Sequence, residues 1–226
     1  MSTYFKRDLF DFLKELTVHN KRDWFQANKE RYEAQVRDPF LRLISDLGSG
    51  LKKIDPHFVA DPKPTGGSMM RIYRDIRFSK DKSPYKTSVA AHFWHKKGKD
   101  GAMPAYYLHL EPGASLIGGG MWRPETRAVK KIRNRIVSHA KDWQRATADF
   151  KSSSGWSMGG ESLTRAPLGY DSNHPLIEDL KRKDFVVGRR LSNREVCSSD
   201  FLDLALDDFH SISTLIRFLS SAVGLK

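Results

Sequence analysis

The sequence has one cysteine, Cys197, among its 226 residues, so an internal disulfide and a cysteine-rich zinc site are both excluded. No apolar run approaches the roughly 20 residues that a membrane-spanning helix needs, which predicts that the protein has no membrane partner. The first residues, MSTYFKRDLFDFL, carry charges every few positions, so they lack the apolar stretch of a signal peptide. Together these absences predict a cytoplasmic protein.

Complete motifs for catalysis and for metal binding are absent as well. There is no HExxH pair, and the glycine-rich stretch IGGGMWRPE (117–125) lacks the Gly-Lys-Ser/Thr ending of a Walker loop. His92, His109 and Glu111 could share a metal ion only in one particular register of two strands. We therefore predict no metal and no cofactor.

The glycine-rich stretch leaves two interpretations open. A helix that begins at Pro124 or Glu125 could hold an anion through its free backbone N–H groups. Three glycines would also let a strand and a helix pack closely, because glycine has no side chain. Close packing is the interpretation that we favour.

Positive charge is abundant and unevenly distributed. The formal net charge is +12, and the stretches 63–99, 123–151 and 181–194 carry net charges of +8, +6 and +5. These add up to +19, so the rest of the chain carries −7. Clustered cations attract anionic partners and speed their encounter, although a well-solvated basic surface would show the same composition.

Hydrophobic spacing predicts an α+β fold in a single domain over residues 1–226. Helical spacing runs through the first 55 residues, with Asn20 as an N-cap and Asp38-Pro39 at the start of a third helix. Gly48 and Gly50 are expected to weaken that helix or end it early. A long middle helix begins at Pro124 or Glu125, and a C-terminal helix begins after Ser198 or Ser199.

Between the helices, alternation of apolar and polar residues predicts a sheet. The expected strands cover residues 69–78, 85–95, 105–111, 114–117 and 185–191, whereas 152–160 is expected to be a loop. Most connections are short or rich in glycine, which suits antiparallel pairing. We therefore predict a central, mostly antiparallel sheet of about four to five strands, packed by the N-terminal, middle and C-terminal helices.

The most basic stretch of the chain is RIYRDIRFSKDKSPYKT (71–87), which we call the basic segment. It holds six cations and two carboxylates, namely Arg71, Arg74, Arg77, Lys80, Lys82 and Lys86 with Asp75 and Asp81. On an unbroken strand, Arg74 would lie on the apolar face, where an unpaired guanidinium is costly. Arg74 should therefore meet an internal carboxylate, lie at the open end of the sheet or line a pocket. Two acids cannot neutralise six cations, which favours an outside anion held by Arg and Lys side chains.

Further residues could extend an anion site. Arg127, Lys131 and Arg135 recur every four residues and predict a second basic surface on the middle helix. Aromatics such as Tyr73 and Tyr85 lie close to the cations in sequence, as in proteins that stack single-stranded nucleic acid. The same aromatics are common in strands of any function.

Asp171 and His174 lie in the loop 165–175 and offer a carboxylate beside an imidazole, which is a general-base arrangement. An ordinary Asx-turn explains the same pair of residues, and we favour the turn.

Several stretches, taken in order, resemble the bacterial and fungal domain-of-unknown-function family 2461. They are WFQANKERYE, the basic segment, the pair YYLHLEPG and GGGMWRPE, and PLGYDSNHP followed by LKRKDF. The resemblance runs from about Phe12 to Phe185, and the family's longest string, at Arg71 to Lys86, shows no departure in this chain. It implies one domain of mixed α and β structure, and it implies no activity, catalytic residue or cofactor.

Three functional hypotheses follow from these residues. The first is a module that binds nucleic acid, a phosphorylated small molecule or another anionic ligand through a clamp of Arg71, Arg74, Arg77, Lys82, Tyr85 and Lys86. The second is an enzyme for an anionic substrate, with Asp75, Asp81 and His174 as acid–base candidates. The third is a structural or interaction protein in which the Arg–Asp pairs form a scaffold.

Overall fold

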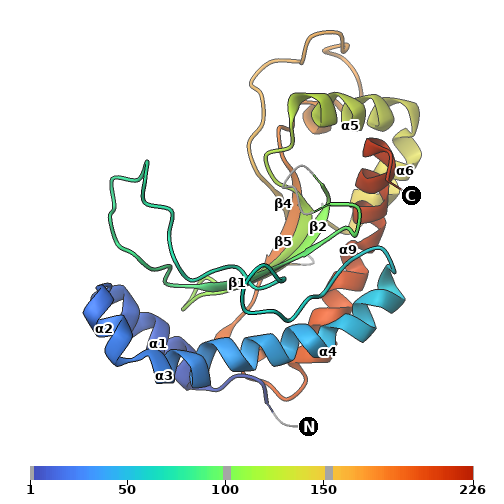
Figure 1. Ribbon diagram of the computed structural model, residues 1–226. Helices are drawn as coiled ribbons and strands as arrows, with labels where there is room; N and C mark the ends of the chain where they lie inside the picture. Colours follow the sequence, from blue (N-terminus) through green and yellow to red (C-terminus); the bar gives the residue numbers. More distant parts are fainter. Residues whose placement is uncertain (1–2, 99–102, 151–154, 226) are drawn as a thin grey trace. The chain divides into compact units, whose positions relative to one another are not determined.

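The computed structural model describes residues 3–98, 103–150 and 155–225 and confirms the α+β fold (Figure 1). Five strands form an open antiparallel sheet in the order β1-β2-β3-β5-β4. Their bounds are β1 Val89–Trp94, β2 Ala105–Leu110, β3 Leu116–Met121, β4 Trp156–Gly159 and β5 Phe185–Arg190. In the β4–β5 pair, Trp156 lies opposite Arg189 and Gly159 lies opposite Val186.

The described residues form two compact units. The first unit comprises Met1–Phe93, Tyr107–Ile117 and Arg190–Asp207. The second unit comprises Trp94–Tyr106, Gly118–Arg189 and Asp208–Lys226. The single domain expected over residues 1–226 stays a prediction.

The first unit contains the N-terminal helices. Their bounds are α1 Arg7–Val18, α2 Arg22–Ala27, α3 Lys29–Tyr32 and α4 Asp38–Ile54, and a π-helical turn, Glu33–Arg37, joins α3 to α4. The helical path is therefore continuous across Asp38. The expectation that Asp38 caps a separate helix is wrong. The predicted apolar face of α4 is confirmed, because Phe40, Leu43, Ile44, Leu47 and Leu51 are all fully buried.

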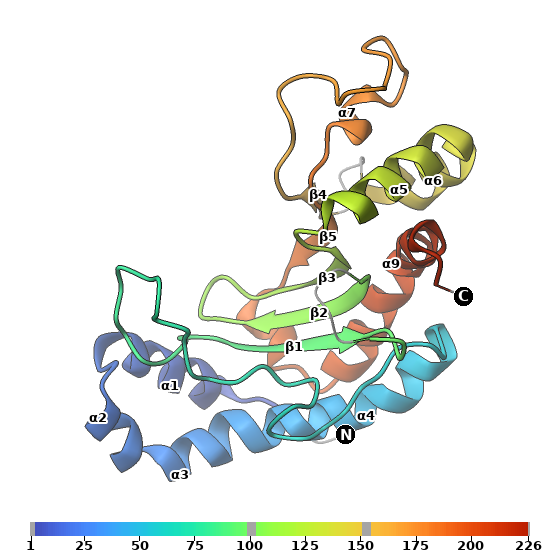
Figure 2. The ribbon, with the colours of Figure 1, turned by 45° about the horizontal axis from the view of Figure 1, so that its top comes forward.

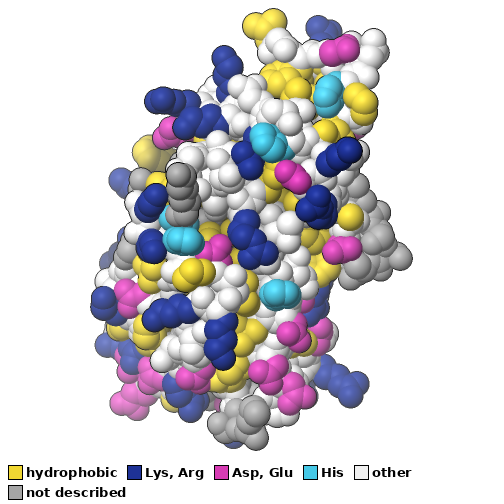
Figure 3. Space-filling view, turned by 90° about the vertical axis from the view of Figure 1, so that its right-hand side faces the viewer, with side chains coloured by type: hydrophobic (Ala, Val, Ile, Leu, Met, Phe, Trp, Pro, Cys, Tyr) yellow, Lys and Arg dark blue, Asp and Glu magenta, His cyan; other side chains and the backbone are white. Residues whose placement is uncertain are grey.

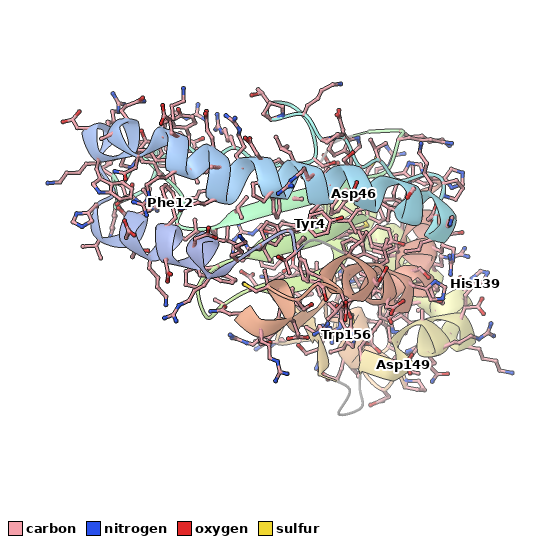
Figure 4. All side chains as sticks on the ribbon, turned by 90° about the horizontal axis from the view of Figure 1, so that it is seen from below. Tyr4, Phe12, Asp46, His139, Asp149 and Trp156 are labelled. Carbon is pink, nitrogen blue, oxygen red and sulfur yellow. The ribbon has the colours of Figure 1, made fainter. Side chains whose placement is uncertain are left out.

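The glycines of α4 do not end the helix, so this expectation is wrong. The helix runs on to Ile54, and a Cβ atom on Gly50 would lie 2.5 Å from the Leu206 side chain. Gly50 therefore lets a neighbouring segment of the first unit approach the helix closely. One turn before Gly50, Asp46 accepts a hydrogen bond from the hydroxyl of Tyr4, and the two lie together in Figure 4.

The second unit contains the middle helix, which is broken at His139. Its two parts are α5 Thr126–Ser138 and α6 Ala140–Thr147, followed by a 3-10 turn at Ala148–Phe150. Trp143 of α6 is fully buried, and its ring centroid lies 6.1 Å from that of Phe185 and 5.3 Å from that of Phe218. The C-terminal helix α9, Phe201–Val223, contributes Phe218 and also Phe209, whose ring lies 5.0 Å from that of Tyr106.

The three glycines of the stretch 117–125 lie inside β3, which is longer than the strand expected over 114–117. A Cβ on Gly118 would lie 2.1 Å from the Val187 carbonyl oxygen, and one on Gly120 would lie 2.1 Å from that of Phe185. Gly118 and Gly120 therefore allow β3 to lie close against β5. A Cβ on Gly119 would lie 2.9 Å from the Ile212 side chain of the C-terminal helix, so the close packing of strand and helix that we favoured is also present.

The prediction of a loop over 152–160 is wrong for the residues of this stretch that form a strand. Residues 152–154 lie outside the described part of the chain, and 156–159 form β4. Two short helices complete the elements, α7 Ile177–Leu180 and α8 Asn193–Val196. Across the described ranges, no helix has the length and apolar character needed to cross a membrane.

Candidate functional site

The two arms of the basic segment are paired with each other, but they form no continuous strand. The N–H of Arg74 donates to the Pro84 carbonyl at 2.9 Å, and that of Lys86 donates to Ile72 at 2.8 Å. Residues 69–78 follow an irregular path with isolated β-bridges between Met69 and Ala91 and between Tyr73 and Tyr85. The prediction of a strand over 69–78 is therefore wrong. In Figure 1 and Figure 2 the segment appears as a long teal loop beside the start of β1.

The two carboxylates of the basic segment are both used by its own arginines. Arg74 pairs with Asp81, and Arg77 donates to both oxygens of Asp75 at 2.9 and 2.7 Å. Hydrogen bonds from Ser83, and then the Arg74 guanidinium, lower the pKa of Asp81 to about 2. The Arg74 partner expected from the sequence is therefore an internal acid.

A third cation of the clamp is also engaged within the segment. The Lys82 ammonium donates to the Ile76 carbonyl at 3.0 Å. Asp75, Arg77 and Asp81 are all exposed, and exposed ion pairs contribute little to stability. These contacts hold the loop in shape and leave fewer charges for a ligand.

Arg71, Lys82 and Lys86 are the clamp cations that form no ion pair within the described ranges, and of these Lys82 is held by the Ile76 carbonyl. Hydrogen bonds from Arg77, and then the positive charge of Arg71, lower the pKa of Asp75. Arg71 and Lys86 flank the hydrogen bond between Lys86 and Ile72, and each lacks an ion pair with a described carboxylate. Burial, and then the positive charge of Arg71, lower the pKa of the half-buried Lys86. Two like charges side by side in a partly desolvated place are stabilised by an added anion.

Tyr85 anchors the basic segment in the core of the first unit. Its side chain is 2% exposed and stacks on Phe25 with 4.1 Å between ring centroids. Its N–H donates to Oδ1 of Asn20 at 3.1 Å, and its carbonyl accepts from Nδ2 of Asn20 at 3.0 Å. The Asn20 amide thus pairs with Tyr85 as a neighbouring strand would.

The role expected for Asn20 was therefore wrong. Helix α2 follows Lys21, and no side chain caps it. The sequence holds no signal that links Asn20 to a residue 65 positions later, because the contact depends on the tertiary fold.

Of the three cations predicted to form a second basic surface on α5, one is not exposed. Arg127 and Lys131 are exposed, whereas the Arg135 guanidinium lies 5.4 Å from the centroid of the Phe218 ring. Arg135 therefore packs within the second unit through a cation–π contact. On the face shown in Figure 3, Lys and Arg side chains lie singly or in small groups among acidic and apolar ones.

The acid–base candidates do not form a catalytic group in either unit. Asp75 and Asp81 are ion-paired in the first unit, and His174 belongs to the second. Nδ1 of His174 accepts the Leu176 N–H at 3.1 Å, while Asp171 accepts the Asn173 N–H at 2.9 Å as in an Asx-turn. The turn that we favoured for Asp171 is therefore confirmed.

A row of polar side chains on β2 was only partly recognised from the sequence. Nδ1 of His109 lies 3.2 Å from the Tyr107 hydroxyl, and Nε2 lies 2.9 Å from Oε2 of Glu111. A carboxylate that orients an imidazole is a general-base arrangement, and alternation along a strand was the signal for it. His92 does not complete a metal site there, because no three His, Cys, Asp or Glu side chains of the described chain gather around one point.

Comparison with known proteins supports the resemblance seen in the sequence. A family model described as "Conserved hypothetical protein (DUF2461)" matches residues 8–218, which is most of the chain. No curated protein and no solved structure matches the chain. The description of this family names no activity.

Proposed function

We propose that this chain, which belongs to the DUF2461 family, binds a phosphate-bearing or other anionic ligand at Arg71 and Lys86. One observation carries the proposal: Lys86 is half-buried beside Arg71, and neither of them forms an ion pair with a described carboxylate. A phosphate group offers several acceptor oxygens and would offset the repulsion between the two cations. The remaining clamp residues shape the loop, since Arg74 and Arg77 are already paired.

Titration with inorganic phosphate tests this proposal. Arg71→Ala and Lys86→Ala should each weaken the binding measured by calorimetry by at least about 10-fold, because each removes a charge-assisted contact. Lys80→Ala is the matched control, because Lys80 is an exposed cation of the same segment and should leave the affinity nearly unchanged. Equal affinity in all four proteins would show that the segment is a scaffold, as the third hypothesis holds.

The affinity should also depend on pH through Lys86. Its pKa lies below the ordinary 10.5, so the side chain loses its proton at a lower pH than a free lysine. Phosphate affinity should therefore begin to fall at a pH below 10.5, where a phosphate group keeps its double charge. In Lys86→Arg the guanidinium stays charged, so the affinity should persist. An identical decline in both proteins would contradict this assignment.

Salt dependence separates a nucleic acid from a small ligand. A single-stranded oligonucleotide that also touches other exposed cations of the first unit, such as Lys80, should lose affinity steeply with added salt, whereas a small phosphate ester should lose little. An enzyme acting on the bound anion would need a free acid or base beside Arg71, and Asp75 and Asp81 are both paired. Binding is therefore the function that the geometry favours, and the single cysteine fits a cytoplasmic site of action.

A further inference from the structure

The second unit contains a cavity of about 340 Å³ whose lining is rich in charge. Its walls come from the start of α5, from the residues after β4 and from those before β5. The lining residues are Arg123, Pro124, Thr126, Val129, Arg133, Glu161, Leu163, Lys183 and Asp184. This volume lies at the small end of the range typical of ligand sites.

Arg133 is the partly buried cation of this cavity, and it lacks an acid. Its Nη2 donates to the Arg182 carbonyl at 3.0 Å, whereas its Nε is buried and has no hydrogen-bond partner. Within the described part of the second unit, Arg133 forms no ion pair. A guanidinium keeps its charge at any ordinary pH, so a partly buried one is stabilised by an anion.

The acids of the cavity are committed to other partners. Asp184 is 2% exposed, and its oxygens accept the N–H of Arg123 at 2.6 Å and the N–H of Glu161 at 2.8 Å. The Glu161 carboxylate pairs with Lys183 at 3.1 Å, where both side chains are about half exposed. Neither carboxylate is paired with Arg133, so the positive charge of Arg133 is not neutralised locally.

Backbone strain marks the same place. Arg123 has φ 49°, and it is the one non-glycine residue with positive φ in the described chain. Such conformations cost free energy and persist where the surroundings impose them, often at ligand sites. Here the hydrogen bond that the Arg123 N–H donates to Asp184 holds the conformation of Arg123 at the cavity wall.

We propose that this cavity binds the phosphate group of a small ligand, with Arg133 as the main partner and with Lys183 and Arg123 at the edge. The first turn of α5 carries no acidic residue, and Glu125 precedes it as the N-cap. This site is separate from Arg71 and Lys86, which belong to the first unit.

The double variant Arg71→Ala/Lys86→Ala isolates the cavity from the first site. Titrated with inorganic phosphate and with glycerol phosphate, it should keep one binding site. Adding Arg133→Ala should weaken that site by at least about 10-fold, because a partly buried charge-assisted contact is lost. Arg127→Ala on the same helix is the matched control, since Arg127 is exposed and does not line the cavity.

Arg133→Lys keeps the charge but not the two-pronged geometry, so it should recover part of the affinity if an anion is bound. Loss of all phosphate binding in the Arg71→Ala/Lys86→Ala protein would overturn the cavity proposal and leave the first site standing. Equal affinity with and without Arg133→Ala would overturn it as well. Circular dichroism of each variant ensures that only folded proteins are compared.

Discussion

Asp184→Ala should lower the free energy of unfolding by about 3 kcal/mol, because it removes a buried carboxylate that accepts two backbone N–H groups. The N–H groups of Arg123 and Glu161 both point at the Asp184 carboxylate, 2.6 and 2.8 Å away. Each orphaned donor costs about 1–3 kcal/mol, and water has little access to a residue that is 2% exposed. Thermal unfolding should shift down by roughly 6–12 °C in a chain of this size.

Two further variants make this result specific. Asp184→Asn keeps one acceptor oxygen but turns an N–H₂ towards the other donor, so it should lose about half as much stability. Asp142→Ala in the same unit removes an exposed carboxylate whose pairing with Arg145 spans 3.5 Å, and it should change stability little. Equal losses for the Asp184 and Asp142 variants in urea unfolding would mean that the buried acceptor is not what matters.

Tyr85→Ala should cost about 4 kcal/mol, as is usual when a large buried aromatic is truncated. The ring is 2% exposed and contacts Phe25 and Tyr73, at 4.1 and 5.4 Å between centroids. Removing it leaves a hole beneath the basic segment at the point where Asn20 holds the main chain. The loss should be visible in denaturant unfolding followed by tryptophan fluorescence.

Tyr73→Ala is the matched control for this cluster, because Tyr73 is 51% exposed and should cost less than about 1 kcal/mol. Tyr85→Phe should keep most of the stability, since the stacking ring remains. If Tyr85→Phe lost as much as Tyr85→Ala, the hydroxyl and not the packing would be the source of the effect.

Local patterns predicted most of the helices and the positions of β1, β2, β3 and β5, whereas β4 was expected to be a loop. The apolar spacing of α4 appeared in the core as expected, because a helix buries whichever face carries its large side chains. Alternation failed at 69–78, where the partner segment contains Pro84, which has no N–H to donate, and where Asp75 and Asp81 bind their own arginines. Alternation of apolar and polar residues does not reveal such local contacts, which compete with the hydrogen bonds of a strand.

The candidate sites were predicted in part. The basic segment was found from its charge, but which of its cations stay unneutralised depends on ion pairs that form only in the folded loop. Arg133 was missed, although it follows Val129 by one helical turn and therefore shares its side of α5. The regular recurrence of Arg127, Lys131 and Arg135 predicted a basic surface on another side of the same helix.

The left-handed conformation of Arg123 has a consequence for how tightly the cavity could hold a ligand. Asp184 fixes that conformation in the free protein, so the strain is already present before any ligand arrives. Binding then spends no free energy on ordering the main chain at Arg123, which is the advantage of preorganisation. A ligand that contacts Arg123 would therefore meet a main chain already held in its final conformation.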